Sequence, residues 1–266
     1  RSVWVELKYS VEDELLGTAG GVKNCEWFLD DTFVIASGDA LTDVDLTRLM
    51  AAHRKNGALA TIALKEVDEV EHFGVVVTDD NGRIKRFQEK PRASEALSHN
   101  ANTGIYIFEP EIFKYIPARQ FYDFGKQVFP HLVKAEAPFY GVPIDDYWCD
   151  VGNIDTYRQA HEDIVMGRVR VLTSGQLQHG LDNKAHLLMG EGTTLGDNVK
   201  CSGTVVLGAG CKIGDNAVVN NAVIWDNSVV GAGSNINEAV IGADCVIGSA
   251  VTITADSVIA SGCKIN

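Results

Sequence analysis

Aliphatic residues recur every six positions in the last third of the chain, and this repeat restricts the possible folds more than any other feature. The series runs through Leu195, Cys201, Leu207, Ile213 and Val219, resumes after a one-residue deletion at Ile224, Val230 and Ile236, and after another deletion continues at Ile241, Ile247, Ile253, Ile259 and Ile265. A six-residue repeat of this kind is typical of a parallel β-helix. Each short strand cannot bury its aliphatic side chain alone, whereas stacked coils bury all of them as one column.

A second position of the repeat carries small or modest side chains. Four residues after each aliphatic stand Val199, Val205, Cys211, Ala217, Val223, Ser228, Ser234, Val240, Cys245, Val251, Ser257 and Cys263. Three of the cysteines occupy this position, so we interpret them as packing residues. The repeat is still in phase at Asn266, and because a solenoid needs a capping end, we expect the natural chain to continue.

The first part of the chain alternates strand and helix patterns instead. Apolar runs bounded by turn residues predict strands over 33–36, 58–64, 74–78, 84–87 and 103–108, with the pair 74–78 and 84–87 forming a hairpin around the turn 79–82. Helical spacing predicts helices from Leu46 to a stop at Gly57, with Asp43 or Asp45 as cap, over 124–134, where Pro130 weakens the pattern, and over 154–166, with Asn153 as cap and Gly167 as stop.

These two patterns predict two domains of different architecture. Residues 1–170 are expected to form an α/β domain with a mostly parallel, Rossmann-like sheet. A linker over 171–194 then leads to a left-handed parallel β-helix over 195–266.

Composition narrows the class of protein further. The chain has 266 residues, a net charge of −13, 45% hydrophobic residues and no apolar run long enough to span a membrane, so neither a nucleic acid nor a bilayer is expected as its main partner. None of the six cysteines forms a C-x-x-C pair, which favours reduced thiols and a cytoplasmic protein. The first residue is Arg and not Met, so the absence of a targeting segment in this sequence says little about the true N-terminus.

Two carboxylates stand at the ends of expected strands or loops, each followed by a helix. Asp39 follows the strand 33–36 and Gly38, and Asp150 precedes the helix that begins near Asn153. Ligands of open α/β sheets bind at the carboxyl ends of strands, and hard carboxylate oxygens suit Mg²⁺. The pair is therefore a candidate magnesium site. Each residue also has an explanation without a metal: Asp39 could cap a loop, and Asp150 could accept from backbone N–H groups at the start of the helix.

Three further side chains have the chemistry of a sugar-phosphate site. Lys90 offers a compact positive charge suited to a phosphate, and Glu89 offers two acceptors for sugar hydroxyls. Asn102, at the start of the strand before Gly104, carries an amide that both donates and accepts. Each of these residues is also common on ordinary protein surfaces.

Six short motifs follow one another along the chain: Leu16-Gly17-Thr18-Ala19-Gly20, Ser37-Gly38-Asp39, Phe73-Gly74-Val75-Val76, Glu89-Lys90-Pro91, Asn102-Thr103-Gly104-Ile105-Tyr106 and Trp148-Cys149-Asp150-Val151-Gly152. In these motifs and their order, the chain resembles the sugar-nucleotide pyrophosphorylases, a nucleotidyltransferase family, over nearly its whole length. Each motif is weak alone, but the six together with the repeat tail are specific for the family. They are less specific for the sugar and the base.

The resemblance implies a role for each matching residue. Leu16 and Gly17 would lie against the nucleotide base, and Asp39 and Asp150 would hold Mg²⁺. The Gly74 backbone with the Glu89 and Asn102 side chains would bind sugar hydroxyls, and Lys90 would hold the sugar phosphate; Asp39, Lys90 and Asp150 would then be the catalytic residues. The reaction would be attack of a sugar 1-phosphate oxygen on the α-phosphate of a nucleoside triphosphate, which needs alignment and charge neutralisation more than a covalent nucleophile.

Within the family, the resemblance is to mannose-1-phosphate guanylyltransferases, so GTP and mannose 1-phosphate are the expected substrates, GDP-mannose is the expected product and a homo-oligomer is the expected assembly. The chain also resembles the bacterial type that often carries a phosphomannomutase domain further on. One departure matters: the Gly-rich loop with Arg, and the Lys after it, that cradle the triphosphate in this family do not occur here. We expect them in a preceding segment of roughly 30 residues or more, at least one βαβ unit.

Three other interpretations stay open. The enzyme transfers a nucleotide to glucose 1-phosphate, or it is a catalytically silent homologue that regulates or binds. The third interpretation is an acyltransferase, because many β-helices of this repeat type acylate sugars or amines. Those enzymes resemble one another in using a histidine from the coils as base. No histidine occurs from Leu187 to Asn266, which disfavours that third interpretation.

Overall fold

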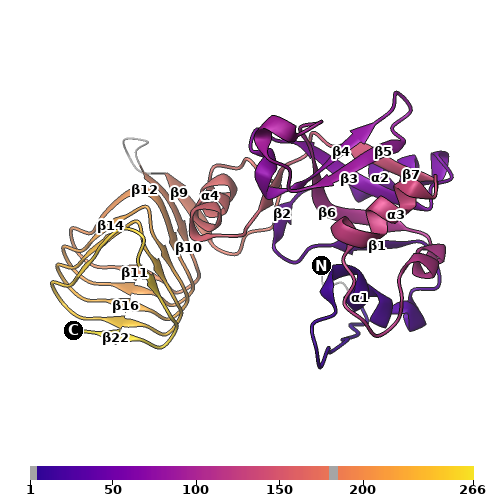
Figure 1. Cartoon of the computed structure of the whole chain (residues 1–266). Coiled ribbons are helices and arrows are strands. Elements are labelled where there is room, and N and C mark those ends of the chain that lie inside the picture. Colours follow the sequence, from indigo (N-terminus) through magenta and orange to yellow (C-terminus); the bar gives the residue numbers. More distant parts are fainter. Residues whose placement is uncertain (1–4, 180–184) are drawn as a thin grey trace. The chain divides into compact units, whose positions relative to one another are not determined.

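The computed structural model describes residues 5–179 and 185–266, and it divides the chain into two compact units, 1–148 and 149–266 (Figure 1). Each unit is described by itself below. Among the described residues, none of the helices combines the length and the hydrophobicity that a membrane span requires.

The first unit is built on a six-stranded sheet. Its strands are β1 (Phe33–Ala36), β3 (Ala60–Glu66), β4 (Gly74–Thr78), β5 (Ile84–Glu89), β6 (Asn100–Phe108) and β7 (Phe139–Pro143), in the order β5-β4-β6-β3-β7 with β1 also paired to β6. Strands β1, β3, β4 and β7 share one direction, and β5 and β6 run the opposite way. Four of the six strands thus share one direction, as expected for a mostly parallel sheet. Because β6 lies between β3 and β4, however, the neighbouring pairs among these described strands are antiparallel except for β3–β7.

Alternation along β6 divides the core of this unit into two layers. Ile105 and Ile107 point to one face, where they pack with Leu49 of helix α2 (Leu46–Lys55). Tyr106 and Phe108 point to the other face, where an aromatic cluster includes Phe129 of helix α3 (Phe129–Lys134). Figure 1 shows the two helices on opposite sides of the sheet.

Shorter elements complete the first unit. They are α1 (Gly17–Asn24), β2 (Ala40–Thr42), a π-helix (Phe124–Val128) and 3₁₀ turns at Glu26–Phe28, Val70–His72, Ala93–Glu95 and Pro110–Tyr115. The sequence analysis did not predict β2 and also missed α1 and β7. The expected helix over 124–134 is two elements, because Asp123 caps the π-turn and Pro130 then sits in the first turn of α3, where its missing N–H costs nothing.

Several expected elements are confirmed with small changes of boundary. Strands β1 and β4 have the predicted limits, whereas β3 is shifted by two residues and β5 and β6 are longer than expected. Asp45, and not Asp43, caps α2, since its carboxylate accepts from the Arg48 N–H at 3.0 Å. Gly57 follows the helix with φ of +53°, as a stop residue should.

The second unit contains helix α4 (Ile154–Val165) and the predicted β-helix, with β8 (Trp148–Asp150) at the boundary between the two units. The strands are β9 (Gln176–His179), β10 (Ala185–Met189), β11 (Thr194–Leu195), β12 (Lys200–Leu207), β13 (Lys212–Ile213), β14 (Val218–Asn220), β15 (Val223–Ile224), β16 (Val229–Val230), β17 (Asn235–Asn237), β18 (Val240–Ile241), β19 (Val246–Ile247), β20 (Thr252–Ile253), β21 (Val258–Ile259) and β22 (Lys264–Ile265). Strand β9 pairs antiparallel with β10. The others stack in parallel as three faces: β11-β13-β16-β19-β22, then β12-β14-β17-β20, then β10-β12-β15-β18-β21, called here the third face.

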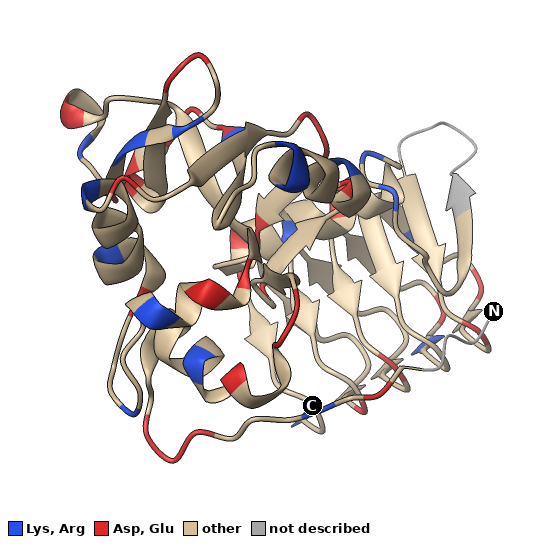
Figure 2. Cartoon of the chain, turned by 90° about the vertical axis from the view of Figure 1, so that its right-hand side faces the viewer, with Lys and Arg blue, Asp and Glu red and all other residues tan. Residues whose placement is uncertain are grey.

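The aliphatic column of the repeat is the core of this unit. Ile213, Ile224, Ile236 and Ile247 are almost fully buried along the axis of the coils. Acidic residues instead lie at the corners between strands (Figure 2), where Asp197, Asp215, Asp226, Asp244 and Asp256 are found. The period of six thus separates an apolar interior from charged corners.

Coils are 18 residues long where the repeat is regular and 17 where a residue is deleted. The deletion changes which residue is small and inward: Ala222 and Ala239 are fully buried in the core, so the assignment of Val223 and Val240 to that position was wrong. Because Ile224 points inward, its neighbour Val223 must point outward. The deletions fall at one corner in successive coils, before β15 and before β18.

Helix α4 packs on the third face of the β-helix, beside β10 and β12 (Figure 1). Val223 and Val240, which point outward there, are nevertheless only 4% and 7% exposed, whereas Val258 one coil further is 57% exposed. The Arg158 guanidinium fixes the helix by donating to the Glu238 carbonyl at 2.7 Å and the Asp256 carboxylate at 2.9 Å. Asn153 and Thr156 form the capping box of α4, as the predicted cap at Asn153 requires.

Candidate active site

The candidate site lies in the first unit, where two strands meet beside β6. Strand β1 pairs with the second half of β6, from Ala36 opposite Ile105 onward, and β4 pairs with its first half through Val75 opposite Ala101. The end of β1 and the start of β4 therefore meet opposite residues 102–104. This break in pairing leaves polar backbone and side chains free of the ladder at one point of the sheet.

Three predicted sugar-binding residues lie in a row across this point. Gly74 is the register partner of Glu89 on β5, and it directly precedes Val75, whose partner Ala101 directly precedes Asn102. A Cβ atom added to Gly74 would lie 3.0 Å from Glu89 Oε2 and 2.6 Å from the Phe87 ring. A side chain at Gly74 would therefore collide with the Phe87 ring and the Glu89 carboxylate, so this buried position needs glycine to let Glu89 lie directly against the β4 backbone.

Lys90 follows at the end of the same row. Its backbone is left-handed, with φ of 44°, and its N–H donates to the Phe73 carbonyl at 3.1 Å. Within the described residues, its ammonium forms no hydrogen bond or ion pair, and its charge acts on the neighbouring Glu89 carboxylate, so it can also act on a bound anion. A left-handed non-glycine residue is uncommon and often occurs at functional sites.

Asn102 is held by two contacts on its own strand. Its Nδ2 donates to the Tyr106 hydroxyl at 3.1 Å, and its Oδ1 accepts from the Gly104 N–H at 3.1 Å. Burial, and then the nearby Asp123 and Glu89 carboxylates, raise the pKa of Tyr106, although the Asn102 bond opposes them, so the phenol stays protonated. The amide keeps one N–H and one lone pair for a ligand.

Glu89 has an unusual electrostatic surrounding for a partly exposed carboxylate. Partial burial, and next the Asp123 carboxylate, raise its pKa, while the Lys90 and Lys126 ammonium groups lower it. Gly125 passes so close that a Cβ there would collide with Glu89 Oε2. The backbone of the π-helix therefore forms one wall beside the carboxylate.

The predicted base-binding motif is fixed against the segment that leads into this π-helix. Tyr122 donates its N–H to the Leu16 carbonyl at 2.8 Å, and its own carbonyl accepts from the N–H groups of Ala19 and Gly20 at 3.0 Å each. Gly17 has φ of +71°, and a Cβ on it would lie 2.7 Å from the Tyr122 carbonyl oxygen. Only glycine fits this turn into α1, both for its backbone and for its space.

Sequence reasoning missed Asp123, which joins the two halves of the candidate site. One carboxylate oxygen of Asp123 accepts from the Thr18 hydroxyl at 2.9 Å, and the other caps the π-helix through the Lys126 N–H at 3.0 Å. The Thr18 hydroxyl in turn accepts from the Phe124 N–H at 3.0 Å. An acidic residue directly before Phe124-Gly125 was the available signal, but its partner lies 105 residues away.

Asp39 lies in the turn that follows β1, as expected. Ser37 donates its N–H to the Gly104 carbonyl at 3.1 Å, which places the start of this turn against β6. A Cβ at Gly38 would meet nothing within 4 Å, so the space beside Asp39 is open. The turn is therefore accessible to a ligand at the same break in the sheet.

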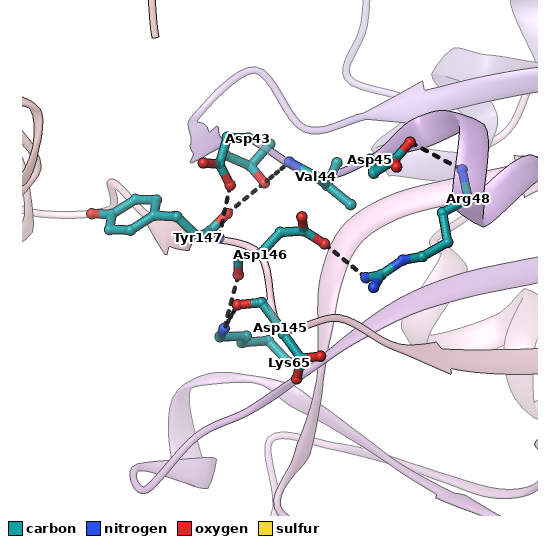
Figure 3. Close-up of polar contacts among 9 residues, drawn as sticks. Asp43, Val44, Asp45, Arg48, Lys65, Asp145, Asp146 and Tyr147 are labelled. Atoms are coloured by element: carbon teal, nitrogen blue, oxygen red, sulfur yellow. Dashed lines mark hydrogen bonds and ion pairs between the residues drawn. The ribbon is translucent and has the colours of Figure 1, made fainter. Parts of the chain in front are cut away.

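The segment that leads to Asp150 is anchored within the first unit (Figure 3). Tyr147 donates its N–H to the Asp43 carboxylate at 2.8 Å, Lys65 donates to the Asp146 carbonyl at 2.8 Å, and Arg48 pairs with the Asp146 carboxylate at 2.8 Å. Trp148 Nε1 then donates to the Thr103 carbonyl at 2.9 Å, beside the candidate site.

Asp150 itself ends β8, in the second unit, where the Gly152 backbone passes close to its carboxylate. Two carboxylates of this kind are suitable oxygen ligands for Mg²⁺. Among the described residues, no cluster of three or more His, Cys, Asp or Glu side chains converges as a metal site.

A mixed α/β unit with glycine-rich turns at a break in its sheet, joined to a β-helix, is the architecture of a nucleotidyltransferase with a hexapeptide-repeat domain. Residues 1–166 match the family model described as nucleotidyl transferase, and residues 171–266 match the one described as the EIF2B subunit epsilon LbH domain. The chain belongs to the nucleotidyltransferase family that acts on sugar 1-phosphates.

Relatives with different substrates are similar to this chain. A UTP–glucose-1-phosphate uridylyltransferase of Synechocystis sp. is 40% identical over 94% of this chain and 73% of its own length. A mannose-1-phosphate guanylyltransferase of Mycobacterium tuberculosis is 31% identical over 86% of this chain, and a glucose-1-phosphate adenylyltransferase of Desulfitobacterium hafniense is 28% identical over 87%. The chain spans 62% and 63% of the length of these last two relatives.

Proposed function

We propose that the protein containing this chain transfers a nucleotidyl group to a hexose 1-phosphate and releases pyrophosphate. The observation that carries the proposal is the row of Glu89, Gly74 and Asn102 across three strands, with the Lys90 ammonium at its end. Hydroxyl-binding groups next to an available cation suit a sugar phosphate. Family membership supplies the class of reaction, and this row supports the assignment of its sugar side.

The proposed roles follow from the chemistry of each group. The Glu89 carboxylate accepts from sugar hydroxyls, Asn102 donates to one or accepts from one, and Lys90 neutralises the sugar phosphate. Leu16 and Gly17 lie against the base, on the turn that Tyr122 and Asp123 hold. These residues align the attacking phosphate oxygen with the α-phosphate of the triphosphate, and such alignment contributes much of the rate in phosphoryl and nucleotidyl transfer.

Asp39 and Asp150 are the proposed Mg²⁺ ligands. Their oxygen donors fit this hard cation, and the open space beside Gly38 leaves room for it at Asp39. When bound, the metal supplies charge neutralisation on the triphosphate.

The substrate pair is the part of the proposal on which sequence motifs and relatives differ. The motifs favour mannose 1-phosphate with GTP, giving GDP-mannose, whereas the 40% identity to a uridylyltransferase favours glucose 1-phosphate with UTP. The Mycobacterium tuberculosis guanylyltransferase is less similar, at 31%. We therefore place glucose 1-phosphate with UTP first and mannose 1-phosphate with GTP second.

The test is pyrophosphate release by the full-length parent protein. Each of UTP, GTP and ATP is combined with glucose 1-phosphate and with mannose 1-phosphate, and kcat/KM is measured for all six pairs. We expect UTP with glucose 1-phosphate to give the highest value, and a higher value for GTP with mannose 1-phosphate reverses our order. Absence of release with every pair overturns the proposal.

A metal-site variant separates chemistry from folding in the same assay. Asp39→Asn is expected to abolish turnover, while Asp30→Asn, an exposed carboxylate at the other end of β1, keeps it. Near-parental turnover of Asp39→Asn with Mg²⁺ present rules Asp39 out as a ligand.

We also propose a cytoplasmic, homo-oligomeric protein. The six cysteines are all free thiols, which is usual in a reducing compartment. Sedimentation of the parent protein under reducing conditions tests the assembly, and a monomer at micromolar concentration contradicts it.

A further inference from the structure

The second unit contains a cavity of about 450 Å³ that the proposed transfer reaction does not use. It lies between the end of α4, the connecting residues 172–175 and the upper coils of the third face, where Trp225 and Asp226 form one corner. Volumes of this size are typical of small-molecule sites.

The walls of this cavity are largely apolar. Ile164 of α4, Leu172 of the connection, Leu188 of β10 and Val206 of β12 line it together with the Trp225 indole. Leu172 is fully exposed and Trp225 is 42% exposed, so a ligand that covers them removes apolar surface from water. The Trp225 ring is held in place, since its Nε1 donates to the Tyr157 hydroxyl at 2.8 Å.

Apart from the Thr173 and Ser174 hydroxyls, which can donate or accept, the polar side chains that line the cavity are hydrogen-bond acceptors and not cations. His161 Nδ1 lies 2.9 Å from the Tyr157 carbonyl, which can only accept, so this nitrogen carries the proton. Burial lowers the pKa of His161, although the Tyr157 bond opposes it, and the neutral ring therefore offers a lone pair on Nε2.

Two carboxylates add negative charge to the same lining. Asp226 Oδ1 accepts from the Ala209 N–H at 2.8 Å, which leaves its second oxygen for another donor, and Glu191 lies on the adjacent coil. Among the described residues that line the cavity, none is Lys or Arg. Charge complementarity thus disfavours an anion and favours a ligand that donates hydrogen bonds from a positive group.

We infer that this cavity binds a compact organic cation, a primary amine attached to an aromatic or branched apolar body. The apolar body covers Leu172 and packs on the face of the Trp225 ring. The ammonium donates to the Asp226 carboxylate and to His161 Nε2. Helix α4 begins four residues after Asp150, so the ligand contacts the element that directly follows a proposed metal ligand. The inference does not depend on the proposed transfer reaction.

Calorimetric titration of the chain with phenethylamine, and with 3-phenylpropionate as an anion of similar size, tests the inference. A dissociation constant on the order of 1 mM is expected for the amine, which has about nine non-hydrogen atoms. No heat of binding is expected for the anion. Equal binding of both compounds, or no binding of the amine at about ten times that concentration, overturns it.

Two pairs of variants locate the site. Asp226→Asn should weaken amine binding by about tenfold, whereas Asp215→Asn, whose carboxylate accepts from the Asp197 N–H at 2.8 Å in the same arrangement but lies outside the cavity, should not. Val206→Phe should fill the cavity and abolish binding, while Val229→Phe, at the same outward position on another face, leaves it unchanged.

The paired variants also separate binding in this cavity from diffuse attraction and from self-association. Equal losses in both aspartate variants mean diffuse attraction of the amine to an acidic protein and overturn the site. If Val206→Phe instead converts an oligomer to a monomer and the amine does not bind, a second copy of the chain covers this surface and the inference is wrong.

Discussion

At the scale of single residues, the candidate site depends on how neighbours hold a few polar side chains. Asn102 is oriented by Tyr106 and Gly104, and Glu89 is enclosed by the Gly125 backbone. Lys90 differs, because its backbone is strained while its ammonium stays available to a bound anion. Substitutions at Lys90 and at Asp123 test these two kinds of side chain.

Lys90→Ala should raise KM for the sugar 1-phosphate by about 10- to 100-fold while KM for the nucleotide changes little, because a charged hydrogen bond to one substrate is lost. Kinetics of the parent protein with each substrate varied separately measure both values. Lys85→Ala is the control, since Lys85 lies on β5, the strand that Lys90 follows, but pairs with Asp79. Equal losses for the two substrates would place Lys90 away from the sugar phosphate.

Asp123→Asn should shift the pH dependence of sugar binding. The raised pKa of Glu89, due first to burial and then to Asp123, means that its carboxylate becomes protonated at higher pH than an ordinary glutamate. Affinity for the sugar 1-phosphate is therefore full above this pKa and falls as pH decreases through it. Removing the Asp123 charge lowers the pKa of Glu89, so the loss of affinity should move to lower pH.

KM for the sugar 1-phosphate, measured from about pH 5 to pH 8, shows this shift as a displaced acid limb. Asp80→Asn, in the turn of the β4–β5 hairpin, keeps the parental profile as a control. An acid limb of Asp123→Asn that coincides with the parental one would contradict the coupling of the two carboxylates.

At the scale of elements, packing partners decide what a local pattern becomes. Helix α4 follows the transferase part in sequence, and the matched family model extends to residue 166, yet its side chains pack on the β-helix. The outward positions of the third face account for this choice, since Val206, Val223 and Val240 offer an apolar surface. The corresponding positions of the other two faces are mixed, with polar Lys212, Asn235, Thr252 and Lys264 beside apolar Val218, Val229 and Val246, so no outward apolar surface is continuous there.

Arg158→Ala should loosen α4 from the coils and lower the free energy of unfolding of the second unit by about 1–2 kcal/mol, because a half-buried charged donor loses the Glu238 carbonyl and the Asp256 carboxylate. Urea unfolding followed by circular dichroism measures the change. Arg168→Ala is the matched control, since its partners Glu162 and Asp163 are on α4 itself. Similar losses in both variants would mean that contact with the coils contributes little.

Ile213→Asp should destabilise the β-helix by about 3 kcal/mol or more, because it buries an unpaired carboxylate in the aliphatic column. Lys212→Asp, at the adjacent exposed position of β13, is the control, because its side chain points outward. We expect a much smaller loss of stability for this variant, and thermal unfolding of both variants measures the difference. A tolerated aspartate at 213 would show that the column is not buried in solution.

At the scale of the whole molecule, the two units have different tasks in our proposal. The proposed sugar-binding row and the proposed nucleotide-binding turn lie in residues 1–148, and we propose that the coils provide assembly. Deletion of residues 195–266 from the parent protein should therefore change its oligomeric state, while some nucleotidyl transfer survives. The deletion also uncovers the face of α4 that packs on the coils, so reduced stability is expected as well.

Sedimentation and pyrophosphate release on the same truncated sample decide between the possibilities. Near-ultraviolet circular dichroism serves as the control for folding of the remaining part. A folded truncated protein without detectable transfer would show that the coils help to build the active site. An unchanged oligomeric state would show that assembly depends on other surfaces.

The sequence alone determined the features that depend on local periodicity. A six-residue period implies a β-helix wherever it occurs, because each coil needs the next to bury its aliphatic side chain. The strand, turn and helix from Phe33 to Gly57 were predicted for the same reason, since their capping and stop residues are neighbours in the chain. The motifs also placed Glu89, Lys90 and Asn102 correctly on or beside their strands.

Only the tertiary structure decided which of these residues meet. The row from Glu89 to Asn102 depends on β4 lying between β5 and β6, and the link from Thr18 to Asp123 joins residues far apart in sequence. The inward position of Ala222 depends on how a deleted residue is absorbed at a corner of the coil. Such contacts follow from the packing of distant segments, which no local pattern records.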